Sequence, residues 1–193
     1  MKKIALIFAL AIASLSQNAA AQDMGKQLRF TVGAGLTFGG DKLATASYTN
    51  GGEIDIRAGS MVALAAGVDY RISPEVSLQA TVGFHVDDAT ASNGDVRFQR
   101  YPIELLAYYN VSPQWRIGGG VRYVSNPKLT SSGAAYIGDL TFKNTVSGVL
   151  EGEYAMSDSI GIKVRYVQEQ FENKYNSHKT DANHVGVFAN FYF

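Results

Sequence analysis

The stretch LRFTVGAGLTF, residues 28–38, alternates strictly between apolar side chains and polar or small ones. Successive side chains of a β-strand point to opposite faces, so this period of two predicts a strand with one apolar face. The apolar face would carry Leu28, Phe30, Val32, Ala34, Leu36 and Phe38. An all-β fold is therefore the first hypothesis for this chain.

The same alternation returns in seven further segments of the chain. They are residues 62–72, 76–86, 101–111, 115–123, 146–156, 160–166 and 184–193. Together with residues 28–38 they predict eight strands. Pro102 fits badly, because proline removes a donor from a strand ladder, and we expect a bulge there toward the loop end. The boundaries near 96–103 and 141–146 are the least defined.

The connections between these segments are of two kinds. Three are short and share one pattern around Ser73, Ser112 and Ser157. In each, a Tyr, any residue and an apolar residue precede the serine, and Pro or Asp follows it. Serine and then proline or aspartate suit a tight β-turn. The other four, at about 39–59, 87–96, 125–141 and 172–183, are longer and polar. Short turns alternating with long loops predict an up-and-down meander with all tight turns at one end.

Composition limits the class of protein. The chain has 193 residues, enough for one domain, with 17 basic and 17 acidic side chains and no cysteine. Disulfide scaffolds and thiolate sites are excluded, and the balanced charge gives no reason to expect a nucleic-acid partner. No apolar run is long enough for a helical membrane span.

The first 21 residues have the pattern of a secretory signal. Lys2 and Lys3 precede an apolar run at 4–15, and a small-residue A-x-A site ends at Ala21. A basic head, a short apolar core and such a site predict a signal peptide, residues 1–21, that is cleaved on export. The mature domain is then residues 22–193.

The polar face of the predicted strands is unusually rich in charge. It carries Arg29, Asp69, Arg71, Arg100, Glu104, Arg116, Arg122, Glu151, Glu153, Lys163, Arg165 and Glu169. Glycines lie on the same face, as a narrow barrel lumen filled by interlocking side chains requires. We expect these charges to pair inside the barrel as a structural network. Glu151 and Glu153 could also suggest a general acid and base, but the neighbouring arginines favour ion pairing.

Aromatic side chains gather on the apolar face beside the short turns. They are Tyr70, Tyr109, Trp115, Tyr154, Phe191 and Phe193. Aromatic rings at one depth are typical of the girdle at a membrane–water boundary. With strands of about 9–11 residues, this favours a membrane barrel over a soluble ligand-carrying barrel, the alternative that alternation alone leaves open.

Taken together, these features resemble the small eight-stranded outer-membrane barrels of Gram-negative bacteria, the OmpA/OmpX type. The resemblance implies an antiparallel, up-and-down transmembrane β-barrel with short periplasmic turns and longer extracellular loops. It implies that Phe191, Tyr192 and Phe193 form the closing segment read by the barrel-assembly machinery. Outer-membrane lipid and lipopolysaccharide are the implied surroundings, and a monomer without the periplasmic domain of OmpA is expected.

The expected function is non-enzymatic, a structural or surface-interaction role carried by the extracellular loops, without cofactor or metal. The alternative is a narrow, porin-like channel, and a lipid-modifying enzyme has less support. Ser177, His178, Asp181 and Glu172 could be drawn as a catalytic set, but adjacent Ser and His on a loop lack an orienting scaffold. His85 and His184 do not match the His-x-Ser pattern of lipid A deacylase barrels. Asp87, Asp88 and Asp95 suggest a solvated loop rather than a cation site.

Overall fold

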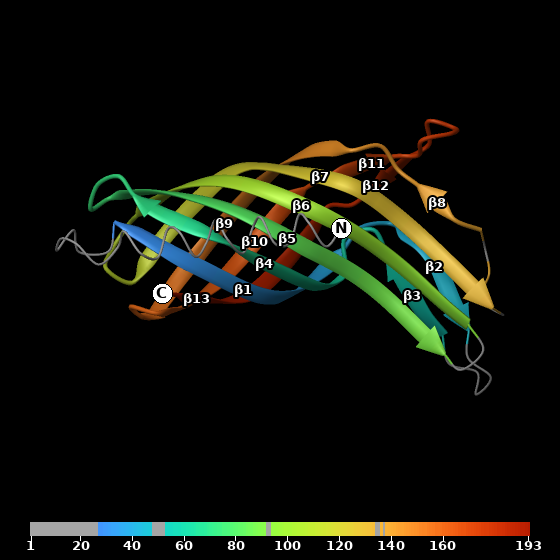
Figure 1. Ribbon diagram of the computed structural model, residues 1–193, viewed down its shortest axis with the longest axis horizontal. Helices are drawn as coiled ribbons and strands as arrows, with labels where there is room; N and C mark the ends of the chain where they lie inside the picture. Colours follow the sequence, from blue (N-terminus) through green and yellow to red (C-terminus); the bar gives the residue numbers. More distant parts are fainter. Residues whose placement is uncertain (1–26, 48–52, 92–93, 134–135, 137) are drawn as a thin grey trace, which may run out of the picture.

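The computed structural model describes residues 27–47, 53–91, 94–133, 136 and 138–193. Eight of its strands close into an antiparallel barrel (Figure 1). They are β1 (Leu28–Gly39), β4 (Met61–Arg71), β5 (Val76–Ala91), β6 (Gly94–Asn110), β7 (Trp115–Gly133), β9 (Thr145–Ser157), β10 (Ile160–Gln168) and β13 (His184–Tyr192). Among the described residues no helix is long and apolar enough to cross a bilayer. The predicted signal peptide, residues 1–21, lies outside the described residues.

Each barrel strand pairs with the next one along the chain, and the first pairs with the last. The closing β1–β13 ladder runs from Thr31 opposite Tyr192 to Gly39 opposite His184. Every barrel strand therefore has a hydrogen-bonded neighbour on both sides, and the sheet closes on itself. The expected all-β, up-and-down topology is confirmed.

The three tight turns have the predicted serine chemistry. The hydroxyl of Ser73 accepts a hydrogen bond from the backbone N–H of Val76 at 3.2 Å, and that of Ser112 accepts one from Trp115 at 3.1 Å. Ser157 does the same for Ser159 at 3.3 Å. Each serine thus replaces a backbone acceptor where the chain reverses. These turns share one end of the barrel, at the left in Figure 1, called here the turn end.

The opposite end, called the loop end, is more ordered than the sequence predicts. The expected loop at 87–96 is mostly strand, because β5 continues to Ala91 and β6 begins at Gly94, and β7 runs on to Gly133. The other loops carry short strands: β2 (Lys42–Ser47), β3 (Glu53–Arg57), β8 (Leu140–Thr141), β11 (Gln170–Glu172) and β12 (Lys179–Asp181). We call these pieces, with the outer parts of β5, β6 and β7, the head; they extend to the right in Figure 1.

The irregularity expected near Pro102 is present, but the extra residue is in the neighbouring strand. Gln99 lies opposite Lys128 and Tyr101 opposite Ser125, so one residue of β6 faces two of β7. Asn126, one of those two, has a φ of 52°. Asparagine tolerates this left-handed conformation better than most residues, which lets β7 absorb the bulge while Pro102 stays in its strand.

Candidate functional site

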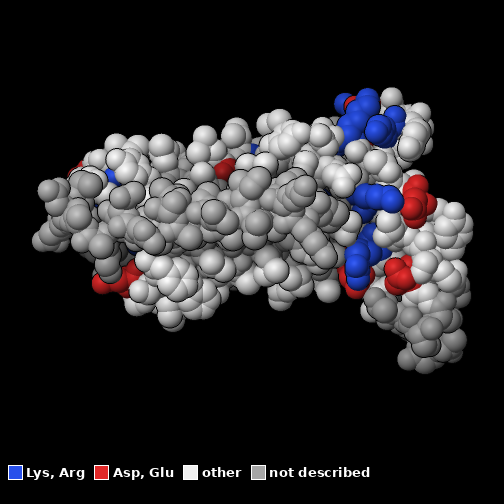
Figure 2. Space-filling view, viewed as in Figure 1, with Lys and Arg blue, Asp and Glu red and all other residues white. Residues whose placement is uncertain are grey.

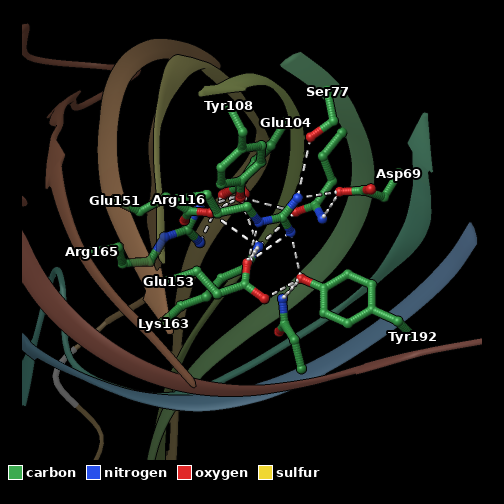
Figure 3. Close-up of polar contacts among 12 residues, drawn as sticks. Asp69, Ser77, Glu104, Tyr108, Arg116, Glu151, Glu153, Lys163, Arg165 and Tyr192 are labelled. Carbon is green, nitrogen blue, oxygen red and sulfur yellow. Dashed lines mark hydrogen bonds and ion pairs between the residues drawn. The ribbon is translucent and has the colours of Figure 1, made fainter. Parts of the chain in front are cut away.

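The lumen holds most of the charged side chains that the sequence places there. Ten of the twelve predicted residues are buried. They are Asp69, Arg100, Glu104, Arg116, Arg122, Glu151, Glu153, Lys163, Arg165 and Glu169. Nine of them come from five barrel strands, and Glu169 directly follows β10. Figure 3 shows seven of them pointing toward one another inside the barrel. Alternation produces this arrangement, as neighbouring residues of β6 show: Leu105 is 54% exposed on the outside and Leu106 is 1% exposed on the inside.

Arg116 is the centre of the network near the turn end. Its guanidinium lies 2.7 Å from Asp69 and 2.7 Å from Glu153. It also donates to the hydroxyl of Tyr192 at 2.7 Å and lies 4.0 Å from the ring centroid of Tyr108. Two carboxylates and two aromatic rings therefore replace its water shell. The half-buried Arg29 completes this layer with a 2.9 Å ion pair to Asp69.

Lys163 and Tyr108 occupy the middle of the lumen. The ammonium group of Lys163 lies 3.0 Å from Glu151 and 2.7 Å from both the Tyr108 hydroxyl and the Gln79 amide oxygen. The Tyr108 hydroxyl in turn donates to Glu151. All three donors of the ammonium thus find an acceptor across the barrel, as a buried lysine requires.

Glu104 links the middle of the lumen to its outer part. It receives two hydrogen bonds from Arg165, at 3.2 and 2.7 Å, and a third from Arg122 at 2.7 Å. Arg165 also reaches Glu151 at 3.0 Å, and Arg122 reaches Glu169 at 3.2 Å. Two arginines from β7 and β10 are therefore held by carboxylates from three other segments. In this linked set the arginine and glutamate charges balance each other, although no member has a full water shell.

Two predicted members stand apart from this network. Arg71 is exposed at the turn end and forms no ion pair with any residue that the structure describes. It is the last residue of β4, beyond the enclosed part of the lumen. Arg100 is fully buried, and it too forms no ion pair with a residue that the structure describes. Its guanidinium lies 2.8 Å from the ring nitrogen of His85 and over the ring of Phe98. The expectation that every lumen charge pairs is wrong for these two.

Several uncharged residues belong to the lumen network although they were not predicted from the sequence. Gln79, Tyr108 and Tyr192 bond directly to the charged groups, and His85 lies between Arg100 and Arg122, with 2.8 and 3.2 Å separating the ring nitrogens from the guanidinium groups. All four lie on the charged phase of their strands. Counting every polar or aromatic side chain of that phase, rather than only the charges, would have found them.

Lumen glycines make room for these side chains. A Cβ atom on Gly118 would lie 2.4 Å from the ring of Tyr108, and one on Gly161 would lie 2.0 Å from a carboxylate oxygen of Glu153. The glycines are therefore part of the site, because any larger residue would displace a network member. The sequence predicts this role, because it places glycines on the same face of the strands as the charged residues.

The free space in the barrel is concentrated at the turn end. A vestibule of about 640 Å³ opens there, bounded by Arg29, Arg71, Trp115 and, at its floor, Arg116 and Tyr192. The cavities among the network residues farther in measure about 20 and 10 Å³. Such cavities have room for about one water molecule each. The network therefore fills the lumen beyond the vestibule.

The head covers the loop end of the lumen with an apolar core of its own. Its largest members are Phe98, Phe142 and Phe171, whose ring centroids lie 5.7–5.9 Å apart. Packed with them are Ala44, Ile56, Ala58, Ala89, Val96, Val124, Leu129 and Ala182. The sequence predicts polar loops here; the core was missed because its residues are scattered over segments of irregular period.

The predicted aromatic girdle lies on the outside near the turn end. Tyr70, Tyr109, Trp115, Tyr154, Phe191 and Phe193 are all exposed, between 41 and 76%. A second set, Phe38, Tyr101, Tyr123 and Tyr166, is exposed toward the loop end. An apolar band between two aromatic sets is the outer surface that a bilayer requires.

Several of the loop residues that could be drawn as a catalytic or cation site make structural hydrogen bonds. Asn173 N–H donates to the carbonyl oxygen of His178, and Asp181 accepts hydrogen bonds from the backbone and side chain of Asn183. Asp87 is 1% exposed and accepts from the N–H of Arg57, so it does not lie in the solvated loop that we expected. No group of three or more metal-ligating side chains occurs among the residues described.

Comparisons with known proteins agree with this geometry. Residues 7–193 match the family model described as "Outer membrane protein beta-barrel domain". The solved structure of Ail from Yersinia pestis, in complex with the heparin analogue sucrose octasulfate, is similar with a TM-score of 0.56 and 10% identity over 86% of this chain and 97% of that one. Neisserial surface protein A gives 0.49 and 10% over the same shares. A search of the curated proteins gave no match.

Proposed function

The chain belongs to the outer membrane protein beta-barrel domain family, and on this premise we propose that it is a non-enzymatic integral outer-membrane protein that acts through its extracellular head. The turn end then faces the periplasm and the loop end the cell exterior. Export by residues 1–21, insertion by the barrel-assembly machinery and a monomeric state belong to the same proposal.

One observation carries this proposal: the lumen is closed and the outer end is folded. Two cavities among the network residues have room for about one water each, and the apolar core of the head lies at the outer end of the barrel. A barrel whose interior is occupied by ion pairs has its available surface outside. The head is the part of that surface that lies beyond the apolar band.

The head has the character of an interaction surface. Tyr136 and Tyr175 are 68 and 83% exposed, and tyrosine is enriched where proteins contact partners. The head also carries half-exposed charge pairs such as Arg97–Asp88 and Lys128–Asp139. At 10% identity the likeness to Ail shows the fold alone, so its ligand does not carry over to this chain.

A narrow channel is the second candidate, and the vestibule is the observation that favours it. Its volume of about 640 Å³ gives solutes entry from the periplasmic side. For conduction, however, ions would have to displace Arg116, Lys163 and the arginines beyond them from their carboxylates. Separating buried pairs is costly, so we expect the path to stay closed.

Solute flux distinguishes the two candidates. Protein refolded into phospholipid vesicles would be tested by the osmotic swelling that follows uptake of small sugars and amino acids, with a general porin as positive control. The proposal predicts swelling no faster than in vesicles without protein. Swelling that rises in proportion to the amount of folded barrel would reject it and establish the channel.

A further inference from the structure

The barrel wall has an opening between β9 and β10 at its extracellular end. The β9–β10 ladder ends at the pair Gly148 and Gln168. Beyond it Ser147 donates to Glu169 at 2.7 Å, and the two backbones pair again at Phe142 and Asn173. A pocket of about 520 Å³ occupies the interval. Its lining includes Lys143, Val146, Gln168, Gln170 and Lys179.

The groups that line this pocket suit a phosphorylated sugar. The side chains of Gln168 and Gln170 are exposed and form no hydrogen bond with described residues, so their amides are available to hydroxyl groups. Lys143 lies 2.5 Å from Glu172, and Lys179 is exposed without an ion pair among the described residues. The pocket carboxylates are occupied: Glu169 by Arg122 and Ser147, Glu172 by Lys143, and Asp181 by Asn183.

Figure 2 shows where Lys and Arg side chains gather on one face of the molecule. The visible wall carries few charges, and Lys and Arg side chains gather where it meets the head. Tyr123 and Tyr166, members of the outer aromatic set, are on the strands next to the pocket. Aromatic girdles mark the level of lipid head groups. Asn144, the neighbour of Lys143, donates to the hydroxyl of Tyr123 at 2.7 Å, so this side of the pocket is at the depth at which lipid phosphates lie.

The wall below the pocket has a notch that suits an acyl chain. On the outer face of β9, Val146 and Leu150 are 70 and 64% exposed, and Gly148 and Gly152 lie beside them. A Cβ atom on either glycine would meet nothing within 4 Å. The notch leads from the pocket toward the middle of the apolar band, so a sugar in the pocket and a chain in the notch can belong to one molecule.

We propose that this opening binds one glycolipid of the outer leaflet, a lipopolysaccharide, with its phosphorylated sugar head group in the pocket and an acyl chain along Gly148 and Gly152. Lys143 and Lys179 bind the phosphate, and Gln168 and Gln170 bind sugar hydroxyls. This deepens the proposed function, on which it rests for the orientation of the barrel, by assigning a lipid partner to one site on the head.

The test measures binding of fluorescent lipopolysaccharide to the full chain refolded in detergent micelles. The double variant Lys143→Ala/Lys179→Ala should bind about thirtyfold more weakly, as expected for two cations near an anionic head group. The matched control is Lys42→Ala/Arg57→Ala on the β2–β3 hairpin, which removes the same charge from side chains that do not line the pocket and should bind like wild type. Equal loss in both would mean diffuse electrostatics and overturn the site.

Further ligands and one more variant separate the parts of the proposal. Removing the phosphates should weaken wild-type binding to the level of the lysine variant, and phosphatidylglycerol should bind more weakly than lipopolysaccharide. Gly148→Trp should weaken binding of the intact lipid and leave a lipid-free phosphorylated oligosaccharide unaffected. Equal affinity for phosphatidylglycerol, or no effect of Gly148→Trp, would reject the sugar or the acyl site respectively. Vesicle swelling is measured independently, so a failed lipid site leaves the proposed function standing.

Discussion

Replacing Glu104 by alanine tests the energetic role of the lumen network. Glu104 is 6% exposed and accepts three hydrogen bonds, two from Arg165 and one from Arg122. Removing one partner of a buried pair typically costs about 3–5 kcal/mol, because the other charge is left uncompensated. Each arginine keeps a second carboxylate, Glu151 or Glu169, so we expect the lower end of this range, about 3 kcal/mol.

This loss is large enough to measure by urea unfolding in phospholipid vesicles. A change of about 3 kcal/mol alters the unfolding equilibrium constant on the order of 150-fold. With an m-value of about 2 kcal/mol/M in urea, the midpoint should fall by about 1.5 M. Trp115 is the single tryptophan and lies in the girdle at 55% exposure, so its fluorescence reports whether the barrel is inserted.

Two further variants make the result interpretable. Glu104→Gln keeps the volume and one acceptor oxygen and should fall between wild type and Glu104→Ala. Glu172→Ala removes an exposed carboxylate whose pKa is lowered by the hydrogen bond from Lys143, and its midpoint should match wild type. If Glu104→Ala unfolds at the same urea concentration as Glu172→Ala, the lumen is wet and the reasoning from buried ion pairs is wrong.

The remaining predictions concern the outer face, the closing strand and the head. Leu105→Arg should destabilise the inserted barrel by about 2–4 kcal/mol and Gln99→Arg, on the same face beyond the apolar band, by about 0–1 kcal/mol; equal midpoints in urea would show that the depth assignment is wrong. Deleting Phe193 removes two backbone hydrogen bonds to Phe30 and should slow insertion into vesicles, whereas Phe193→Ala keeps them and should insert faster than the deletion; equal rates would contradict this. Phe171→Ala should cost the head about 3–5 kcal/mol and speed tryptic cleavage at Lys143 and Lys174, while the barrel keeps its heat-dependent gel mobility; unchanged cleavage would show that the head does not depend on its core.

The barrel could be predicted from sequence because apolar and polar side chains alternate along its strands with a period of two. Once residues 28–38 show an apolar face, the same rule applied elsewhere places Leu105 outside and Glu104 inside, and serine turns fix the order of the strands. The ion-pair partners follow less directly. Partners such as Asp69 and Arg116 are 47 residues apart, so which charges meet depends on register and barrel shear, which alternation does not determine.

The head could not be predicted for a different physical reason. Its core is formed by single side chains such as Phe98, Phe142 and Phe171 from three separate segments that lie far apart in the sequence. The polar residues between them predict loops rather than a folded core. The opening between β9 and β10 was equally hidden, because it results from the absence of pairing between two sequences that both alternate.

Side-chain NMR of the arginines in lipid nanodiscs measures whether the lumen charges are paired and shielded from water. The Nε–H groups of Arg116 and Arg122 donate to Glu153 at 2.9 Å and Glu169 at 3.2 Å, whereas Arg71 is exposed at the periplasmic end and serves as an internal reference. We predict separate, slowly exchanging Nε–H signals for Arg116 and Arg122 that disappear in Glu153→Ala and Glu169→Ala, respectively. Exchange of all three arginines with water at the rate of Arg71 would contradict the account.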